Sequence, residues 1–521
     1  MNKRTGIKGL ALLIVASLVV MTQACALPSL HNRSPSTALN AEAADNTLLG
    51  RTVTPWEQQH ADNSGVIMLP DPLAAFAARM LLIGMSEKTL VLQYYIWQED
   101  TTGRLLLQAL HTAAERGVRV RLLLDDNSTS GLDEELAALA AHPNIQVRLF
   151  NPFLIRGGAK WLNYLTDFSR LNRRMHNKSF TADNQVTIVG GRNVGDEYFG
   201  ATEGVLFADL DVLGVGPVVE DVSDDFDSYW ASKSAYPIED IVSTADSGAL
   251  VALTEAHFGL ADEAADVSRY LKAVSESSFM DQFLNQALEL EWTTVQMISD
   301  DPAKALGKVS QDDLLTSHLA RVLKVPQHSV NLVSPYFVPT EAGTVAFREL
   351  EASGVEVAVL TNSLNATDIA IVHAGYAKRR KPLLRGGVRL YEMRQLAAPP
   401  EPEGLILSIS RSGSSLHAKT FSIDGKRVFV GSFNFDPRSA NLNTELGFLI
   451  DSSAMARRID SAFETEVPSY AYEVRLDDDD DLYWLEQQGN DLFRHDVEPE
   501  THILERLLVH FFALLPIEWL L

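Results

Sequence analysis

Two segments of the chain carry histidine, lysine and aspartate at the same spacing. The first, MHNKSFTADNQVTIVGGRN, starts at Met175, and the second, LHAKTFSIDGKRVFVGSFN, starts at Leu416. In each, lysine follows histidine by two positions, aspartate follows lysine by five, and glycine and then asparagine come at matching distances. The candidate residues are His176, Lys178, Asp183 and Asn193 in the first segment and His417, Lys419, Asp424 and Asn434 in the second. We expect the segments to form two halves of one active site.

These residue types suit phosphodiester chemistry. One imidazole could attack phosphorus while the other, protonated, gives its proton to the departing oxygen. Two ammonium groups and two amides could stabilise the charge that develops on the nonbridging oxygens. So much fixed positive charge makes a metal ion unnecessary, and no His/Asp/Glu cluster has metal-ligand spacing. We therefore expect neither a metal nor another cofactor.

Each imidazole needs a carboxylate to orient it. Glu445, in NLNTELGFLI, lies eleven residues after Asn434, and Asp209, in LFADLDVLG, lies at the corresponding place in the first half. Asp183 and Asp424 follow their own motifs too closely to be nucleophiles. We expect these two aspartates to fix the local geometry of the site.

Each motif is predicted to lie on a hairpin. Asp183-Asn184 and Asp424-Gly425 are turn dipeptides between runs of strand-forming residues. Side chains two apart on a strand share a face, so the histidine and lysine of each motif should project together. Gly190 and Gly431 should permit a tight turn that brings each asparagine back towards that face.

The sequence around the motifs is duplicated. KTLVLQYYIW, GRLLLQALHTAAERG and VRVRLLLDD predict strand, helix and strand, and SVNLVSPYFV, EAGTVAFRELEASG and VEVAVLTNS repeat that order. Tyr95 and Tyr336, Val147 and Val388, and the two motif histidines all share an offset of 241 residues. We expect an α/β fold of two duplicated domains related by a pseudo-twofold axis, each a mixed β-sheet flanked by helices.

A chain of 521 residues suits two or three domains. The predicted parts are a targeting segment at 1–25, a linker at 26–62, a first domain at 63–245, a helical connector at 246–325, a second domain at 326–470 and a tail at 471–521. The linker is rich in Ser, Thr, Asn and Ala without periodicity, as a tether would be.

The N-terminus is typical of a signal peptide, because basic residues precede the apolar run GLALLIVASLVVM. Cys25, the only cysteine, follows this run and resembles the lipidated residue of a bacterial lipobox, although Thr22 and Gln23 depart from the usual residues. An uncleaved short anchor is the alternative. Both place the protein in a bacterial cell envelope, facing the periplasm; we expect a lipid anchor at Cys25.

The net charge of the chain limits the classes of partner that it can bind. The chain has 44 Lys and Arg against 69 Asp and Glu, a net charge of −25, which argues against a nucleic-acid partner. Basic clusters nevertheless precede both motifs, in Lys160–Arg174 and in HAGYAKRRKPLLRGG, although ordinary solvated helices would look the same. The candidate substrate-binding residues are Arg173, Arg174, Lys378 and Arg379.

Other features have structural interpretations. We expect Tyr95 and Tyr336 to be core aromatics, His373 to be structural, and Asp436-Pro437-Arg438 to form a turn. The closing HILERLLVHFFALLPIEWLL is too polar to span a bilayer. It could lie in the membrane interface as an amphipathic helix or pack on its own domain.

The paired H-x-K-x-x-x-x-D segments with trailing G-x-x-N resemble the phospholipase D superfamily, over roughly residues 63–470. Both motif segments and the closing LLPIEWLL most resemble bacterial cardiolipin synthases of the C type. The resemblance implies that one histidine forms a phosphatidyl-imidazole intermediate, which the hydroxyl of phosphatidylglycerol then attacks to give cardiolipin. It assigns His176 as nucleophile and His417 as acid and then base.

The resemblance also implies phospholipid substrates, phosphatidylglycerol with phosphatidylethanolamine as a candidate donor, together with a membrane surface and no nucleic acid. Two rival functions stay open: a phosphodiesterase that hydrolyses phospholipid or, as a weaker alternative, nucleic acid, and a lipid-binding protein without catalysis. Gly191 in the first half replaces Ser432 of the second. The missing hydroxyl indicates unequal roles for the two sides.

Overall fold

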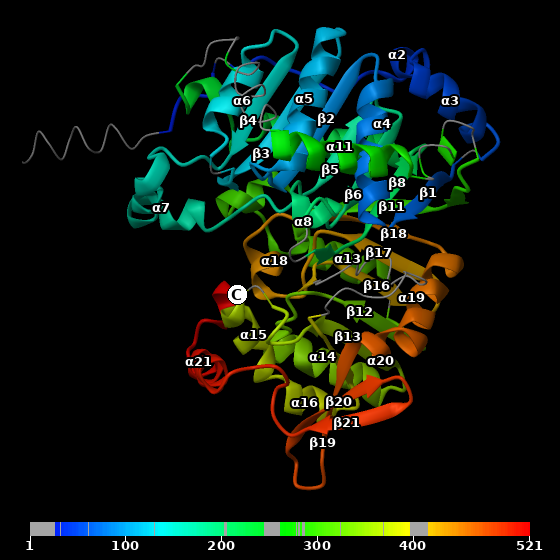
Figure 1. The fold of residues 1–521 in the computed structure, drawn as a ribbon, viewed down its shortest axis with the longest axis vertical. Coiled ribbons are helices and arrows are strands. Elements are labelled where there is room, and N and C mark those ends of the chain that lie inside the picture. The colour runs from blue at the N-terminus through cyan, green and yellow to red at the C-terminus, as the bar shows by residue number, and fades with distance from the viewer. Residues whose placement is uncertain are drawn as a thin grey trace, which may run out of the picture.

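The computed structural model describes residues 27–521, except 32, 61, 130, 203–205, 244–248, 250–260, 278, 280–281, 284–286, 324, 368 and 396–414. The predicted targeting segment and Cys25 lie outside the described residues. Two large β-sheets lie one above the other in Figure 1, and each has helices packed on both of its faces. No helix of the described part is long and apolar enough to cross a membrane.

The first sheet has nine strands in the order β10-β1-β8-β6-β5-β2-β3-β4-β9. Strands β2, β3 and β4 are parallel to one another and the other pairings are antiparallel, so the sheet is mixed. The strands are β1 (Ser64–Leu69), β2 (Thr89–Ile96), β3 (Arg119–Ser128), β4 (Ile145–Phe150), β5 (Ser179–Ala182), β6 (Val186–Gly190), β8 (Asp211–Val215), β9 (Ala235–Pro237) and β10 (Glu291–Thr293). Its helical elements are α4 (Pro72–Met85), α5 (Thr101–Glu115), α6 (Asp133–Ala140), η1 (Gly157–Leu162), α7 (Asn163–Leu171), α8 (Asp196–Phe199), α9 (Val218–Ala231) and η2 (Ile238–Asp240).

The second sheet has ten strands in the order β11-β18-β17-β16-β12-β13-β14-β19-β20-β21. The strands are β11 (Val295–Ser299), β12 (Ser329–Val333), β13 (Glu356–Asn362), β14 (Arg389–Met393), β16 (Thr420–Ile423), β17 (Arg427–Gly431), β18 (Leu446–Ile450), β19 (Ala471–Leu476), β20 (Leu482–Gln488) and β21 (Asp491–His495). Its helices include α14 (Thr340–Ala352), α15 (Ala370–Ala377), α16 (Arg380–Arg385), α18 (Pro437–Asn441), α19 (Ser453–Thr465) and α20 (Val467–Tyr470).

The two sheets share one topology. The run β8-β6-β5-β2-β3-β4 of the first sheet matches β18-β17-β16-β12-β13-β14 of the second, strand for strand. In the order across each sheet, the three parallel strands lie next to the antiparallel hairpin that carries the motif. The prediction of a duplicated α/β fold with mixed sheets is confirmed.

Several contacts join the halves. One hydrophobic cluster contains Val189 and Val212 of the first sheet together with Val430 and Phe448 of the second. A short parallel pair, β7 (Phe207–Ala208) with β15 (Ser415–Leu416), takes one strand from each half. Only Thr294 separates β10 from β11, which belong to different sheets. The halves therefore pack as one body.

The predicted linker differs from a tether in the structure. It contains α2 (Ala41–Asp45) and α3 (Leu48–Glu57), and Leu49 and Val53 of α3 are fully buried in the core of the first half. Asn40 and Thr47 accept hydrogen bonds from main-chain N–H groups at the starts of these helices. Polar residues that look like linker in the sequence are thus helix N-caps.

The predicted connector and tail also contain strands. The connector has the helical elements α11 (Ala261–Ser275), η3 (Pro302–Leu306), η4 (Gln311–Asp313) and α13 (Leu315–Leu323), but Glu291 and Trp292, expected to be helical, lie in β10. In the tail, β19, β20 and β21 extend the second sheet, and the acidic run Asp477–Asp481 joins β19 to β20. The tail ends with α21 (Ile503–Ala513) and η5 (Glu518–Leu520).

Candidate active site

Both motif hairpins are present. Strands β5 and β6 flank one turn and β16 and β17 the other. Asp183, Asn184, Asp424 and Gly425 all have positive φ, from 49° to 61°, as the tight turns of two-residue hairpins require. The hairpin prediction is confirmed.

The histidines and lysines do not lie on the strands themselves. They occupy extended segments just before β5 and β16, and these segments pair with the opposite half of the molecule. The His176 N–H donates to the Thr444 carbonyl at 2.9 Å, and the His417 N–H donates to the Ala208 carbonyl at 2.8 Å. Each motif is therefore positioned by main chain from the other half.

This main-chain pairing of each motif with the other half determines which carboxylate orients which imidazole. Glu445 follows Thr444, and its Oε2 lies 2.8 Å from Nδ1 of His176. Asp209 follows Ala208, and its Oδ2 lies 2.5 Å from Nδ1 of His417. Because Nδ1 contacts a carboxylate, Nε2 is the ring nitrogen left for the substrate. Each half supplies the carboxylate for the other half's histidine.

Both histidines line a single cavity of about 390 Å³. Asn193 and Asn434 line it too, so the cavity brings together four of the candidate residues. Its remaining wall is largely apolar and includes Phe207 and the C-terminal Leu521. The cavity therefore exposes both imidazoles to the same bound molecule, beside a largely apolar wall.

The two lysines are almost fully buried beside the histidines, and neither lines the cavity. Lys178 Nζ donates to the His176 carbonyl at 2.6 Å, and Lys419 Nζ donates to the His417 carbonyl and lies 3.0 Å from His417 Nδ1. Burial, helped by Lys419, lowers the pKa of Lys178 well below its usual value, although Glu445 opposes the shift. A bound phosphate anion would stabilise the protonated form of both lysines.

The two histidine–carboxylate pairs differ electrostatically. Burial and the nearby Lys178 and Lys419 lower the pKa of His176 well below 6.5, and burial raises the pKa of Glu445 to about 7. Burial also lowers the pKa of His417, to about 4, but Asp209 opposes that shift. Although burial disfavours its charge, contacts with His417, Lys419 and Arg192 hold the pKa of Asp209 at about 2.

The asparagines differ in their contacts. Asn193 Oδ1 accepts a hydrogen bond from the Ile96 N–H at 3.2 Å, and its Nδ2 donates to the Tyr198 hydroxyl at 2.9 Å. Asn434 Oδ1 has no hydrogen-bond partner among the described residues. The Asn434 oxygen is thus a free acceptor, and only the Nδ2 donor of this amide could bind a phosphate oxygen.

The motif aspartates hold the hairpins in place. Asp183 accepts hydrogen bonds from the main-chain N–H groups of residues 87, 88 and 89, at the start of β2. Asp424 does the same for residues 327, 328 and 329, at the start of β12. Neither aspartate lines the cavity. These contacts are those of residues that fix local geometry.

The motif glycines act through close strand contacts, which differs from the expected tight turn. A Cβ atom at Gly190 would lie 2.2 Å from Asp211 Oδ1, and one at Gly431 would lie 2.3 Å from the Leu446 carbonyl oxygen. Any side chain here would push β6 from β8, or β17 from β18.

The four predicted substrate-binding residues already have protein partners. Arg174 is buried and donates to Asp125, and Arg173 donates to the main-chain carbonyl of Asn441. Lys378 and Arg379 pair with Glu518 of η5. None of the four lines the cavity, and their contact with substrate stays a prediction.

Other residues, given structural roles by the sequence, line the cavity instead. Tyr95 and Tyr336 do so, and the Tyr95 ring lies 4.9 Å from the ring of His176. Arg438 lines it as well, and its guanidinium donates to Asn172. The offset of 241 residues that Tyr95 and Tyr336 share with the motif histidines could have indicated that they lie at the site. For Arg438 the sequence offers no such signal beyond its position four residues after Asn434. His373 is buried against Arg380, consistent with a structural role.

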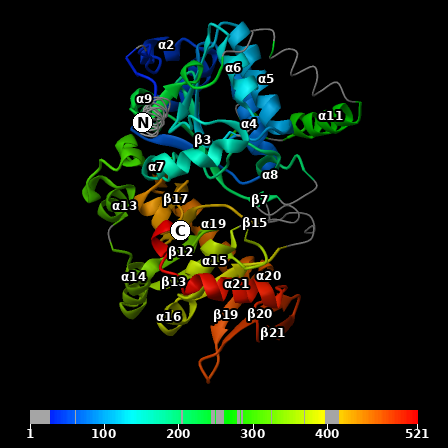
Figure 2. The ribbon, with the colours of Figure 1, turned by 90° about the vertical axis from the view of Figure 1, so that its left-hand side faces the viewer.

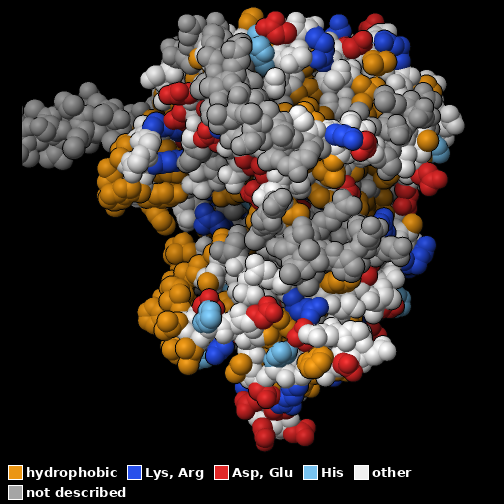
Figure 3. Space-filling view, viewed as in Figure 1, with side chains coloured by type: hydrophobic (Ala, Val, Ile, Leu, Met, Phe, Trp, Pro, Cys, Tyr) orange, Lys and Arg blue, Asp and Glu red, His pale blue; other side chains and the backbone are white. Residues whose placement is uncertain are grey.

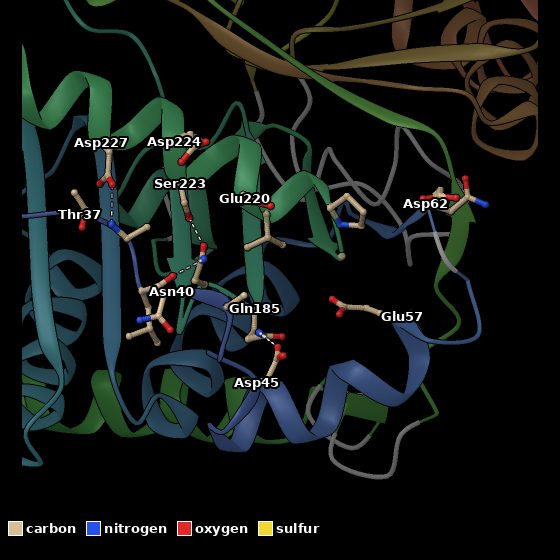
Figure 4. Close-up of a pocket in the computed structure, with 18 of the residues that line it drawn as sticks. Thr37, Asn40, Asp45, Glu57, Asp62, Gln185, Glu220, Ser223, Asp224 and Asp227 are labelled. Atoms are coloured by element: carbon tan, nitrogen blue, oxygen red, sulfur yellow. Dashed lines mark hydrogen bonds between the residues drawn. The ribbon is translucent and has the colours of Figure 1, made fainter. Parts of the chain in front are cut away.

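A second cavity, of about 650 Å³, lies away from both histidines. Figure 4 shows acidic side chains around it, from α2, α3 and α9 and from the loop that follows α3. They include Asp45, Glu57, Asp62, Glu220, Asp224 and Asp227. So many carboxylates would repel a phosphate anion, so the histidine cavity is the candidate active site.

Comparisons with known proteins agree with this geometry. Residues 81–230 and 319–467 match the family model described as cardiolipin synthase, PLD-like domain. Cardiolipin synthase C of Escherichia coli K12 is 48% identical over 91% of this chain and 99% of its own length. Cardiolipin synthase A of Pseudomonas entomophila is 26% identical over 82% of this chain and 73% of its own.

A solved structure shares the fold. The crystal structure of phosphatidylserine synthase from Haemophilus influenzae Rd KW20 superposes with a TM-score of 0.53 and 12% identity, over 90% of this chain and 100% of that one. Because the family model covers more than half of the chain and the 48% identical relative nearly all of it, this chain belongs to the cardiolipin synthase family, with two phospholipase D-like domains.

Proposed function

We propose that this chain is a cardiolipin synthase that transfers a phosphatidyl group from a phospholipid donor to phosphatidylglycerol through a phosphohistidine intermediate. The observation that carries the proposal is one cavity lined by two histidines, each oriented by a carboxylate from the other half. The 48% identical relative named cardiolipin synthase C supports the same reaction.

In the first step, Nε2 of His176 attacks the phosphorus of the donor. A P–N bond forms, the bond from phosphorus to the head-group oxygen breaks, and the protonated His417 gives its proton to that oxygen. In the second step, His417 accepts the proton of a phosphatidylglycerol hydroxyl while that oxygen attacks phosphorus. The P–N bond breaks, cardiolipin forms, and both histidines return to their starting states.

The assignment of roles follows from the carboxylates. Asp209, with a pKa of about 2, carries a full negative charge beside His417 and stabilises its imidazolium form. Glu445, with a pKa raised to about 7, carries less charge beside His176, which stays neutral and nucleophilic. Burial nevertheless keeps the pKa of His417 at about 4, so the imidazolium forms only when a bound phosphodiester adds a second negative charge beside it.

The other motif residues stabilise the charge on the phosphate or hold the site in its geometry. Lys178, Lys419 and the Asn434 amide would hold the nonbridging phosphate oxygens as their charge grows. Asn193 would keep the Tyr198 ring against His417, at 5.2 Å between ring centroids. Asp183 and Asp424 would maintain the two hairpins.

The setting of the reaction is also part of the proposal. The donor is phosphatidylglycerol or phosphatidylethanolamine, nucleic acid is not a substrate, and the protein faces the periplasm of a bacterial envelope, anchored by lipid at Cys25. The boundaries 63–245 and 326–470 are kept for the two catalytic domains, with α2, α3 and β19–β21 as additions to them. Arg173, Arg174, Lys378 and Arg379 are assigned to positioning the walls of the site.

Product analysis tests the proposal. The purified chain is given phosphatidylglycerol vesicles with and without phosphatidylethanolamine, and products are identified by mass spectrometry. We expect cardiolipin, and none with the His176→Ala variant. Phosphatidic acid as the sole product would overturn the synthase proposal in favour of a hydrolase, and product from the variant would overturn the site assignment.

A further inference from the structure

Two groups of exposed apolar side chains lie on one side of the molecule. The first group, on η1 and α7, is Trp161, Leu165 and Phe168; the second, on α21 and η5, is Ile503, Leu504, Leu507, Leu508, Phe511, Leu514 and Trp519. Leu165, Leu504 and Leu514 are 73%, 75% and 78% exposed. Figure 3 shows one apolar patch over α7 and another over α21, and Figure 2 places the C-terminus between these helices. Together the two groups are the docking face.

The docking face is connected to the active-site cavity from both halves. Helix α7 ends at Leu171, five residues before His176, and the chain that follows α21 ends at Leu521 in the cavity wall. Arg438 joins the two. Its guanidinium donates to Asn172, at the end of α7, and its N–H donates to the main-chain oxygen of Leu521 at 2.8 Å. The wall of the cavity therefore adjoins the chain beside both apolar groups.

Helix α21 is fixed to the second half by only part of its apolar surface. Val509 is buried against Leu364 and against Ala374 of α15. The exposed residues form a separate stripe along the helix. Eleven residues span only about 16 Å, too short to cross a bilayer but suited to lying in its surface. A contiguous exposed patch of this kind marks an interaction site.

We propose that the docking face inserts into one leaflet of a phospholipid membrane and holds the cavity mouth against it, so that lipid passes directly from leaflet to active site. The inference rests on the proposed function, because a cavity that takes phospholipid must receive it from a membrane. A second copy of the chain bound at this face would cover the cavity wall beside the two groups, which favours lipid as the occupant.

The charge of the chain separates this mode of binding from electrostatic attraction. A protein with a net charge of −25 is repelled by an anionic surface, so apolar insertion must supply the affinity. Salt screens that repulsion. Binding to phosphatidylglycerol vesicles should therefore stay constant or strengthen as salt is raised; binding that falls with salt would contradict the proposal.

Tryptophan quenching locates the contact in the full chain, even where the N-terminal segment also binds lipid. The probe is a vesicle of phosphatidylglycerol and phosphatidylcholine with brominated acyl chains. We expect quenching in the wild type and loss of most of it in the double variant Trp161→Phe, Trp519→Phe. The matched control, Trp56→Phe on α3, should retain it. Quenching that survives in the double variant, or is absent from the wild type, would overturn the proposal.

Turnover separates failure of docking from failure of the proposed function. The variant Leu165→Glu, Leu504→Glu should make cardiolipin at least ten-fold more slowly than wild type from vesicles, but within two-fold of it from detergent-dispersed lipid. Leu492→Glu, at a residue 67% exposed on β21, is the control and should match wild type in both.

Each remaining outcome has one meaning. A variant as fast as wild type on vesicles would overturn docking and leave the synthase proposal intact. A wild type that makes no cardiolipin from vesicles or from detergent-dispersed lipid, but shows the expected quenching pattern, would support docking and overturn the synthase proposal. A wild-type dimer that Leu504→Glu makes monomeric, with vesicle turnover unchanged, would assign the face to a second copy and overturn lipid docking.

Discussion

The two half-sites use different pairs of residues at equivalent positions. Around His176, Ser432 donates a hydrogen bond to the Glu445 carboxylate. Around His417, Gly191 takes the serine's place, and a Cβ there would lie 2.1 Å from Asp209 Oδ1. The shorter Asp209 reaches His417 only because residue 191 has no side chain. Carboxylate length and the neighbouring residue are therefore matched in each half.

This difference teaches how a duplicated scaffold acquires two chemical roles. Both halves keep histidine, lysine and asparagine at the same spacing, but the carboxylate pKa is about 2 for Asp209 and about 7 for Glu445. Asp209 partly offsets the effect of burial on the pKa of His417, which is about 4, while the pKa of His176 falls well below 6.5.

Removal of either histidine should produce the largest effect. We expect His176→Ala and His417→Ala each to lower turnover by about 10³-fold or more, since both groups act on the reacting atoms. A phosphatidyl p-nitrophenol substrate then separates them, because its leaving group needs no proton. Single-turnover release of p-nitrophenolate should recover in His417→Ala and stay absent in His176→Ala; the reverse pattern would exchange the two roles.

Alanine at the two equivalent small positions should give unequal losses. Gly191→Ala must displace Asp209, and we expect turnover to fall about 100-fold, like the loss of an oriented acid–base group. Ser432→Ala removes one hydrogen bond to Glu445, and about ten-fold is expected, equivalent to about 1.4 kcal/mol. Steady-state kinetics with phosphatidylglycerol vesicles measures both. Equal losses would show that the half-sites are not matched in the way described.

Amide replacement of the carboxylates should change stability in opposite directions. The pKa of Asp209 is lowered from 3.8 to about 2, so its charge stabilises the fold above pH 3.8 and that contribution is lost as pH falls towards 2. The pKa of Glu445 is raised from 4.5 to about 7, so its stabilising effect is present below pH 4.5 and is lost as pH rises through 7.

At pH 8, therefore, Asp209→Asn should lower the free energy of unfolding by about 2 kcal/mol, while Glu445→Gln should leave it unchanged or raise it by up to about 3 kcal/mol. Denaturant unfolding at pH 8 and pH 5 measures both. The advantage of Glu445→Gln should disappear at pH 5. A loss of stability in both variants at pH 8 would contradict the electrostatic contrast.

The asparagines should give the smallest difference. Asn193→Ala breaks hydrogen bonds to Ile96 and Tyr198, and we expect a loss of about 1–2 kcal/mol in unfolding free energy together with about ten-fold in kcat/KM. Asn434→Ala should cost a similar factor in kcat/KM with stability unchanged within about 0.5 kcal/mol, because its Oδ1 has no partner in the described residues. Equal losses of unfolding free energy in the two variants would show that the asparagines do not differ in their contacts.

Local patterns in the sequence were sufficient to predict the duplicated fold and the two hairpins. Turn dipeptides, strand alternation and the common offset are short-range signals, and they place His176, His417 and the asparagines correctly in one cavity. The exchange of Glu445 and Asp209 between halves was not predictable, because it depends on main-chain pairing of His176 with Thr444 and of His417 with Ala208.

Long-range contacts give some residues functions that the local sequence does not indicate. Asn40 and Thr47 look like linker residues but cap helices, and the basic residues before the motifs look available to substrate but pair with Asp125 and Glu518. The contacts of the basic residues are made with residues far away in the sequence, so local patterns do not reveal them. Arg438 lines the cavity because α18 lies at the cavity wall. No local sequence pattern indicates this position.

Trapping of the covalent intermediate tests the central claim most directly. The enzyme is mixed with phosphatidylglycerol, denatured within one turnover at alkaline pH, digested and analysed by mass spectrometry. We predict a phosphatidyl group on the peptide that contains His176 and none on the peptide that contains His417. A modified His417 peptide, or the absence of modification on both during active turnover, would contradict the account.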